Sequence, residues 1–417
     1  MNITHPIYGT LEFNDMLSEL INTPEVNRLK RIIQLGLVSL VFPGALHNRF
    51  LHAIGVCHFA GKIADHLKLS EQDKNLIQAA ALLHDVGHGP FSHTLESLIP
   101  RSHDHEVKGK EIILGKTKMN MPGSGRIPKI LDKYKVDKKI VAELIIGKHK
   151  AKPYLQQIIS GPIDADKMDY LLLDSHFTGA KIGIIDVARL LDVMVLENNK
   201  IKFLEKGKPT IQALRTARSN MFAEVYIHHT ARIADKMLLK AVELSLKELP
   251  EFYEFDDFKL ISRLEDSPVK KTRELVQRII YNVNPEGDTN GVRNLYKVAY
   301  QIKTEDFTRK KQALVKKLKK LGSKKIESLL LKKLNLEKGD IIIDFPETLP
   351  KYSQKEFDDL NISFKQSRGK SNYAAFSVYC SKENKEGVGK AVKELILILN
   401  KTLLLSSIEK KYLLNHK

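Results

Sequence analysis

The chain has 417 residues, 42% hydrophobic and 28% charged, which is the composition of a soluble globular protein with a large core. Two cysteines exclude a disulfide framework, and no apolar run is long enough to span a bilayer, so we expect a cytoplasmic protein without a membrane partner. The N-terminus also lacks the basic and apolar regions of a signal peptide. The net charge of +18 indicates either an anionic partner, nucleotide or nucleic acid, or a lysine-rich surface that water solvates.

The first predicted elements are a hairpin and three helices. Residues 7–13 alternate around a glycine, a pattern typical of a short β-hairpin. Residues 23–35 begin with a Thr-Pro pair, the cap and first position of a helix, and continue with helical spacing. Apolar periodicity predicts two more helices, at 48–67 and at 73–84.

Residues 100–130 are polar and contain glycines, so they are expected to form a mobile excursion from the core. Beyond them the sequence predicts helices at 138–146, 153–159, 164–174 and 210–248 and a short strand at 200–204. The signals stay mainly helical up to residue 300.

After residue 300 the pattern changes. Pairs of lysines stud a leucine-containing helical stretch at 310–333, and strands are predicted at 339–345 and 376–380, followed by a helix at 388–400. The polar segment 367–371 between the strands is expected to be mobile. The predicted fold class is therefore mainly α, with an all-helical core, a small N-terminal hairpin and an α+β C-terminal subdomain. We place the catalytic core in residues 1–300 and an oligomerisation or regulatory subdomain in residues 301–417.

Ionisable side chains suited to catalysis or metal binding are most concentrated in residues 81–93. An apolar helix ends on His84-Asp85, and a Gly-His-Gly-Pro turn then places His88 outside the helix. Imidazole beside carboxylate at a helix end suits a divalent metal such as Mg, Mn, Fe or Zn. A buried histidine hydrogen-bonded in the core is an equally good interpretation of these residues alone.

This chain resembles the HD-domain deoxynucleoside triphosphate triphosphohydrolases, a family with SAM-and-HD-domain members in animals and dGTPase-like members in bacteria. The resemblance covers about residues 5–300, beginning directly at the catalytic part. It rests on residues 28–36 (RLKRIIQLG), 41–45 (VFPGA), 47–52 (HNRFLH), 83–93 (LHDVGHGPFSH), His105-Glu106 and 164–170 (DADKMDY). The last part of 83–93 together with DADKMDY is the most specific of these motifs.

The resemblance implies hydrolysis of a dNTP to a deoxynucleoside and inorganic triphosphate. It assigns metal binding to His52, His84, Asp85 and Asp166, and catalysis at the α-phosphate to His88, His105 and Arg49. His103 competes with His105 on spacing, but the following Glu106 favours His105. A histidine titrating near neutral pH can protonate a leaving 5′ oxygen, as this role requires.

Substrate binding is likewise implied by the resemblance. The matching residues are Gln34, Asn48, Arg49, His93, Lys167, Tyr170, Asp174, Arg218 and Tyr226. Among them Gln34 and Asp174 match positions that hold the 3′-hydroxyl, and Tyr170 and Tyr226 match aromatics that pack on the sugar. Core packing remains an alternative for Tyr226, and the chain departs from the animal enzymes at Phe222, where they have a histidine.

The family also implies a homo-oligomer, a dimer or tetramer, regulated by a nucleotide activator. The corresponding positions are Asn22, Asn27, Lys30, Val41, Phe42 and Arg293. A carboxylate and a guanidinium are replaced among them, which puts recognition of a guanine activator in question. Two other functions stay open: an HD phosphohydrolase of monophosphates, cyclic nucleotides or ppGpp, and a nucleic-acid-binding protein that uses the lysine-rich stretch.

Overall fold

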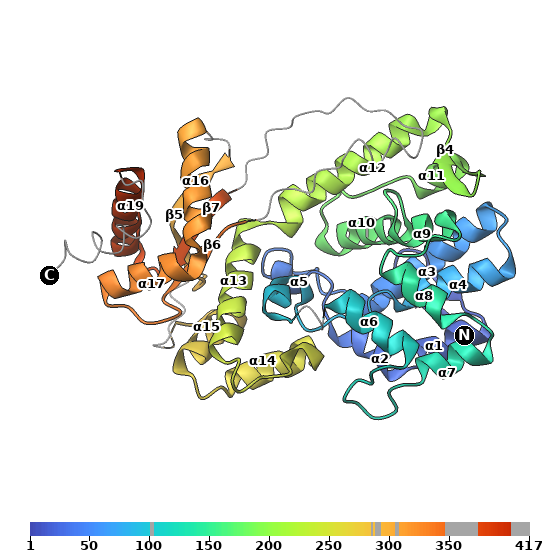
Figure 1. Cartoon of the computed structure of the whole chain (residues 1–417), viewed down its shortest axis with the longest axis horizontal. Helices are drawn as coiled ribbons and strands as arrows, with labels where there is room; N and C mark the ends of the chain where they lie inside the picture. Colours follow the sequence, from blue (N-terminus) through green and yellow to red (C-terminus); the bar gives the residue numbers. More distant parts are fainter. Residues whose placement is uncertain (101–103, 285–286, 288–292, 305–307, 347–373, 402–417) are drawn as a thin grey trace. The chain divides into compact units, whose positions relative to one another are not determined.

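The computed structural model describes the chain except for residues 101–103, 285–286, 288–292, 305–307, 347–373 and 402–417 (Figure 1). Packing divides the chain into two compact units. The described part of the first comprises Met1–Ile227 and Glu251–Leu260, and that of the second lies within His228–Pro250, Ile261–Pro350 and Ser367–Lys417. The functional boundary expected near residue 300 stays a prediction.

The first unit is helical, with two small hairpins at its surface. Its helices are α1 (Asp15–Ile21), α2 (Pro24–Arg28), α3 (Arg49–His66), α4 (Glu71–Leu83), α5 (Ser92–Leu95), α6 (His105–Leu114), α7 (Ile127–Lys133), α8 (Lys138–Ile145), α9 (Pro153–Ser160), α10 (Ala165–Thr178), α11 (Val187–Asp192) and α12 (Lys208–Met221). Its antiparallel hairpins pair β1 (Asn2–His5) with β2 (Gly9–Glu12) and β3 (Met194–Glu197) with β4 (Lys200–Phe203).

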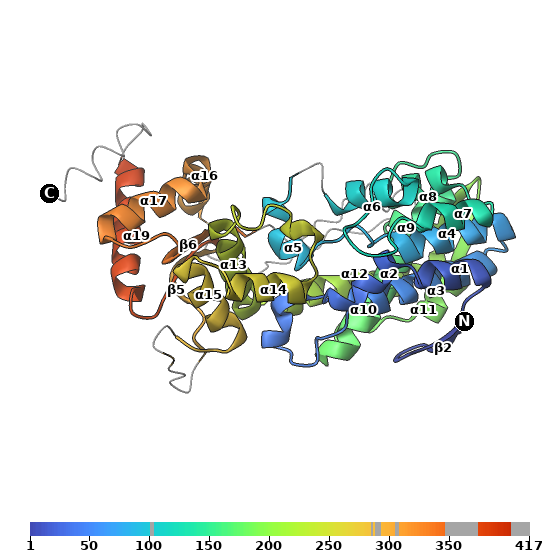
Figure 2. The same ribbon diagram turned by 90° about the horizontal axis from the view of Figure 1, so that it is seen from below.

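Helix α3 lies at the centre of this unit and packs against α4 and α10 (Figure 2). Its first turn is capped by Asn48, whose Oδ1 accepts from the Leu51 N–H at 3.0 Å. Small residues such as Gly55 and Gly61 along its buried faces let neighbouring side chains approach its backbone. Functional groups carried by α3, α4 and α10 are therefore brought close together.

Two predictions for the N-terminal segment were wrong in detail. The hairpin turns at residues 6–8, before Gly9, so its strands begin at Asn2 rather than within 7–13. The helix at 23–35 ends as α2 at Arg28 and a short 3-10 turn. Residues 32–34 leave the helix because they pair with 47–49: the Arg49 N–H donates to the Ile32 carbonyl at 2.9 Å.

Residues 100–130 are not a simple excursion, because α6 and the start of α7 lie within them. The Asp104 side chain caps α6. The long helix predicted at 210–248 is interrupted by a π-helical turn at Phe222–Tyr226, after which His228 caps a new helix. The helices at 48–67, 73–84, 138–146, 153–159 and 164–174 are confirmed to within a few residues.

The second unit combines helices with a small sheet. Its helices are α13 (His229–Leu244), α15 (Lys270–Ile280), α16 (Arg309–Leu321), α17 (Ser323–Leu334) and α19 (Lys385–Lys401), and α14 (Asp257–Glu265) belongs to both units. The antiparallel sheet has the order β5 (Lys297–Lys303), β7 (Ala374–Cys380) and β6 (Ile341–Asp344). The predicted mainly α chain with an α+β C-terminal part is thus confirmed. The segment 367–371 lies outside the described residues.

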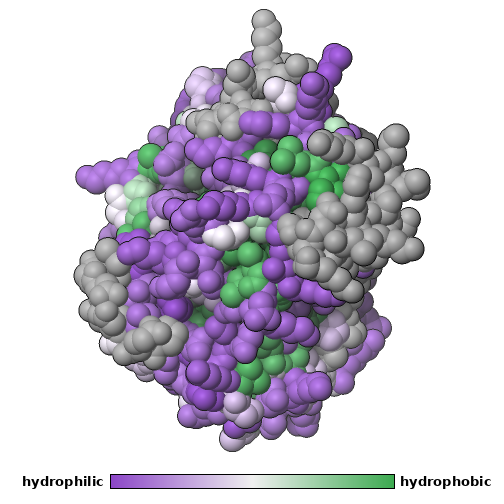
Figure 3. All heavy atoms as spheres, turned by 90° about the vertical axis from the view of Figure 1, so that its left-hand side faces the viewer, coloured by the Kyte–Doolittle hydropathy of each residue, from purple (hydrophilic) through white to green (hydrophobic). Residues whose placement is uncertain are grey.

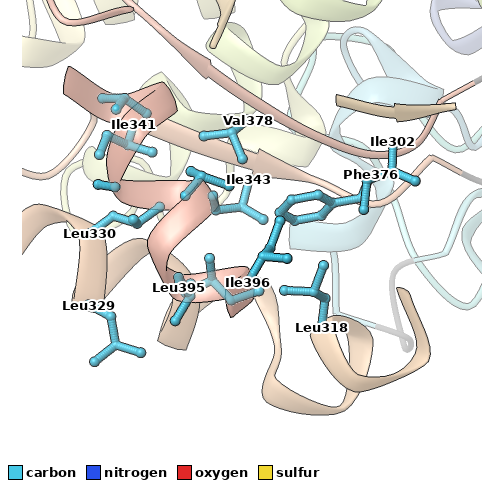
Figure 4. Packing of buried hydrophobic residues seen from close by; sticks show 14 of the residues in the cluster. Ile302, Leu318, Leu329, Leu330, Ile341, Ile343, Phe376, Val378, Leu395 and Ile396 are labelled. Carbon is cyan, nitrogen blue, oxygen red and sulfur yellow. The ribbon is translucent and has the colours of Figure 1, made fainter. Parts of the chain in front are cut away.

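The core of the second unit lies between the sheet and α16, α17 and α19. Ile341 and Ile343 of β6 and Phe376 of β7 pack with residues of these helices (Figure 4). Other residues of this cluster include Leu318, Leu330 and Leu395.

The lysine pairs of α16 and α17 lie on the opposite side from the leucines, mostly exposed to solvent. The face drawn in Figure 3 is largely hydrophilic, with scattered hydrophobic residues. This favours the interpretation of the lysine-rich stretch as a solvated helix face. Among the helices that the structure describes, none is long and apolar enough to cross a membrane.

Candidate metal centre

Four side chains from three helices converge in the first unit. His52 comes from α3, His84 and Asp85 from the end of α4, and Asp166 from the first turn of α10. The ligand atoms of His52, His84 and Asp85 all lie within 4.8 Å of one another. The Asp166 Oδ1 lies 3.1 Å from the His52 Nε2 and 4.0 Å from the His84 Nε2. The structure thus brings together the residues predicted as metal ligands.

The two imidazoles are oriented so that their Nε2 atoms share one space. The Nδ1 of His52 lies 2.7 Å from the Asp169 Oδ2, and the Nδ1 of His84 lies 2.7 Å from the Ala81 carbonyl oxygen. Both partners are acceptors, so each Nδ1 donates its hydrogen to them, and each Nε2 faces the shared space, where it would be the atom that binds a cation. Two such imidazoles and two carboxylates form a donor set that fits a divalent transition metal or Mg.

Both carboxylates of this cluster are held in the charged form. Burial by itself raises the pKa of Asp85, but the neighbouring His84 and the Arg49 guanidinium outweigh it and hold that pKa well below its usual range. For Asp166, burial is likewise outweighed by the His52 hydrogen bond, and its pKa falls to about 2. The centre therefore presents two negative charges to a cation.

A pair of stacked histidines lies beside the centre. The rings of His88 and His105 are 4.0 Å apart at an angle of 11°, and the exposed His93 lies edge-on to His88 at 5.8 Å. The His88 Nε2 is 3.1 Å from the Asp85 Oδ1, and the His105 Nδ1 is 3.4 Å from Glu96. A small pocket with Asp104 and Tyr253 in its wall opens at this pair.

The environments of the stacked histidines push their pKa values apart. Burial and the Arg49 guanidinium hold the pKa of His88 well below its usual range. Burial also lowers the pKa of His105, but the bond to Glu96 and the charge of Asp85 outweigh it, and the net shift is upward. Two neighbouring groups with opposite shifts are a typical acid–base arrangement.

The Gly-His-Gly-Pro turn is held by residues to which the sequence analysis assigned no role. A Cβ at Gly87 would lie 2.0 Å from the His105 carbonyl oxygen, so only glycine lets the start of α6 approach. The Arg28 Nη1 donates to the His88 carbonyl at 2.7 Å. Asp257 accepts from the Phe91 and Ile33 N–H groups, each at 2.8 Å.

The predicted sugar-binding residues form a second group. The Tyr226 hydroxyl donates to the buried Asp174 at 2.7 Å, and the His47 Nε2 lies 2.8 Å from the other oxygen of that carboxylate. The ring of Tyr170 is edge-on to that of Tyr226 at 6.4 Å. His47 was not predicted as a site residue. Its place in the HNRFLH motif was the available signal.

The other predicted substrate-binding residues, those for the phosphates together with Gln34 and Asn48, make contacts of different kinds. The buried Arg49 donates to the Asp85 Oδ2 at 2.8 Å, and Lys167 donates to Asp164 at 2.6 Å and to the Gly161 carbonyl at 2.9 Å. Burial lowers the pKa of Lys167, but the charges of Asp164 and Asp166 outweigh it and the net shift is upward. Arg218, on α12, lies close enough to oppose this shift by repulsion. The buried Gln34 Oε1 has no hydrogen-bond partner among the described residues. The Asn48 side chain is used as a helix cap.

The predicted activator positions lie in both units and stay a prediction. Asn22 and Asn27 donate their side-chain amides to nearby backbone carbonyls, and the Lys30 ammonium donates to the Asn27 Oδ1 at 2.7 Å. Val41 and Phe42 follow the 3-10 turn Gly36–Leu40 of the first unit. Arg293 is exposed in the second unit.

Comparison with protein families finds two matches that follow one another along the chain. An HD domain matches residues 49–174, and an HD associated region matches residues 185–359. The first match contains the four converging residues.

Among curated proteins, the chain is 36% identical over 287 residues to the uncharacterized protein MJ1154 of Methanocaldococcus jannaschii, covering 67% of this chain and 58% of that protein. It is 30% identical over 356 residues to the deoxynucleoside triphosphate triphosphohydrolase SAMHD1 homolog of Dictyostelium discoideum, covering 78% of this chain and 65% of the relative. The chain thus spans less than two thirds of the length of these relatives.

Solved structures agree on the fold. A hypothetical protein from Aquifex aeolicus matches with a TM-score of 0.68 and 26% identity, covering 94% of this chain and 99% of its own. A phosphohydrolase from Bacteroides thetaiotaomicron matches with a TM-score of 0.66 and 22% identity, covering 92% and 99%. The HD domain and the HD associated region follow one another along the chain, and the His/Asp cluster lies within the HD domain. The chain therefore belongs to the HD-domain phosphohydrolases.

Proposed function

We propose that this protein is a metal-dependent dNTP triphosphohydrolase, which cleaves a dNTP to a deoxynucleoside and inorganic triphosphate. The observation that carries the proposal is the His52, His84, Asp85 and Asp166 cluster with a pair of oppositely shifted histidines beside it. The similarity to the Dictyostelium triphosphohydrolase supports the choice of substrate.

The reaction adds water across the bond between the α-phosphorus and the 5′ oxygen. A divalent cation held by the four ligands would act as a Lewis acid toward the phosphate and lower the pKa of a bound water. The upward pKa shift of His105 keeps its proton available near neutral pH, so this residue can donate to the departing 5′ oxygen. His88, with its pKa depressed, stays neutral and can orient a phosphate oxygen or the attacking water.

Arg49 has two tasks in this proposal. It holds Asp85 in the charged form that binds a cation, and its buried guanidinium would bind the α-phosphate of a substrate at the centre. Lys167 and Arg218 add positive charge for the rest of the triphosphate. At the sugar, Asp174 fixes the Tyr226 hydroxyl, and we infer that this pair binds the 3′-hydroxyl side and excludes a 2′-hydroxyl.

Regulation and assembly belong to the same proposal. We infer a homo-oligomer, dimer or tetramer, with a nucleotide activator. Because Asn27 and Lys30 bond to each other and present neither a carboxylate nor a guanidinium, an activator other than a guanine nucleotide is favoured. Size-exclusion chromatography with light scattering, with and without each NTP and dNTP, tests this part.

The test of the activity is product analysis. Each dNTP is incubated with Mn²⁺ or Mg²⁺ and the products are separated by ion-exchange chromatography. Triphosphate as the released product supports the proposal. Release of phosphate or diphosphate, or hydrolysis of monophosphates, cyclic nucleotides or ppGpp alone, would favour another HD phosphohydrolase reaction. Salt-sensitive binding of single-stranded nucleic acid that survives Asp85→Asn would favour the binding protein.

A further inference from the structure

Asp169 is a buried carboxylate one helical turn after Asp166 on α10, and it is not itself a predicted metal or substrate residue. Its hydrogen-bond partners among the described residues are Tyr8 and His52. Its side chain is fully buried. Its two oxygens take two donors: the Oδ1 accepts from the Tyr8 hydroxyl at 2.8 Å, and the Oδ2 faces the His52 Nδ1 at 2.7 Å. Both oxygens are therefore occupied by groups from distant parts of the chain.

The contact with His52 fixes the orientation of the imidazole ring. The Asp169 carboxylate accepts from the Nδ1–H group of His52, and this bond fixes the plane of the ring. The opposite nitrogen, Nε2, then points at the Asp166 Oδ1, 3.1 Å away. Partners of this kind, behind the ligands themselves, orient metal-binding histidines and raise their basicity.

The Tyr8 ring is itself fixed by the N-terminal hairpin and by α3. It stacks on His5 with ring centroids 4.2 Å apart at 5°, and it meets Phe59 edge-on at 4.9 Å. Phe59 is on α3, two turns beyond His52. These two contacts limit the movement of the Tyr8 ring and so keep its hydroxyl directed at Asp169.

We propose that Tyr8 and Asp169 form a positioning chain through which the N-terminal hairpin orients His52 as a metal ligand. This inference rests on the proposed metal-dependent function and adds two residues to it, neither of which is one of the four proposed ligands. The hairpin thereby becomes part of the metal centre's support.

The test measures metal binding directly. Metal-free wild type, Asp169→Asn and Tyr8→Phe are titrated with Mn²⁺ by calorimetry, and the Co²⁺ forms are compared by visible absorption. Asp169→Asn keeps the shape but removes the charge, and we expect its Mn²⁺ affinity to fall by roughly 10- to 100-fold with an altered Co²⁺ spectrum. Tyr8→Phe should lose roughly 3- to 10-fold. Because both act through one carboxylate, the double variant should bind about as weakly as Asp169→Asn alone.

The matched control is Tyr154→Phe, in the same unit. The Tyr154 hydroxyl donates at 2.7 Å to the buried Asp73, which has no contact with the metal residues in the described structure. This variant should lose comparable thermal stability and keep wild-type Mn²⁺ affinity. Equal Mn²⁺ affinity in wild type, Asp169→Asn and Tyr8→Phe overturns the proposed role of Tyr8 and Asp169, and so does an equal loss of affinity in Tyr154→Phe. If wild type binds Mn²⁺ but cleaves no dNTP, the proposed function is refuted. The comparison of Mn²⁺ affinities then still tests whether Tyr8 and Asp169 orient His52.

Discussion

Gly55→Ala is predicted to disturb the metal centre without touching a ligand. A Cβ at Gly55, in the middle of α3, would lie 1.8 Å from the Asp169 Oδ1 and 2.5 Å from its Cγ. Carbon and oxygen do not approach so closely, so the carboxylate must move by more than an ångström. Such a movement breaks its fit to Tyr8 and His52.

The size of the effect follows from opposing contributions. Replacing glycine by alanine inside a helix stabilises it by about 1 kcal/mol. Overpacking costs about 1–3 kcal/mol, and each weakened bond to a buried charged group costs about 1.5–3 kcal/mol. With both bonds affected, the lower ends of these ranges give a net loss of about 3 kcal/mol, so we expect at least that loss, a fall in Tm of roughly 6–12 °C or more, and a fall in Mn²⁺ affinity of roughly 10- to 100-fold.

The control is Gly61→Ala on the same helix. Its Cβ would lie 2.6 Å from the Nε2 of Gln78, the far end of a flexible side chain that can rotate away. This variant should be as stable as wild type or up to about 1 kcal/mol more stable, with unchanged Mn²⁺ affinity. Differential scanning calorimetry and metal titration measure both quantities. Gly55→Ala that matches Gly61→Ala in both would refute the reasoning about Asp169.

Three further predictions concern other parts of the first unit. Burial lowers the pKa of His5 from 6.5 to about 4, so between these values the unfolded chain binds a proton that the folded protein does not, and stability falls as the pH drops. His5→Asn should remove up to about 3 kcal/mol of this loss, measured by urea unfolding at pH 7 and pH 4.5, and an unchanged pH dependence would contradict the prediction. His88→Ala and His105→Ala should each lower turnover by roughly 10²- to 10⁴-fold while metal analysis still finds the ion, and loss of the ion would overturn their assigned role. Tyr226→Phe removes the hydroxyl that Asp174 fixes and should raise the KM for dNTP roughly tenfold, with a smaller change in kcat; an unchanged KM would favour a packing role for this ring.

Local signals in the sequence predicted much of the helical framework. Asn48 caps α3 as its residue type suggests, and the apolar run before His84 forms α4. The places where prediction failed are those where a distant segment competes. Residues 32–34 have helical spacing but pair with 47–49, and no local pattern reveals that pairing. The π-helical turn at Phe222–Tyr226 likewise has no breaker residue to announce it.

The part of the site that lies in recognisable sequence motifs was predicted. His52, His84, Asp85 and Asp166 were named by resemblance, and the structure brings them together. Their supporting residues were missed, because their roles depend on three-dimensional proximity. Asp169 lies within the DADKMDY motif, yet only the structure places it between His52 and Tyr8. Arg28 opens the RLKRIIQLG motif and Asp257 lies in no motif, and the roles of both become visible only through their bonds to the turn at residues 87–91.

The most direct test of the central claim is the product released from a dNTP by wild type and by Asp85→Asn, with Mn²⁺ or Mg²⁺ present. The proposal predicts equal amounts of deoxynucleoside and inorganic triphosphate from wild type, and neither from Asp85→Asn, which removes a charged ligand of the centre. No cleavage of any dNTP under any mixture of nucleotide activators, or cleavage that persists in Asp85→Asn, would contradict it.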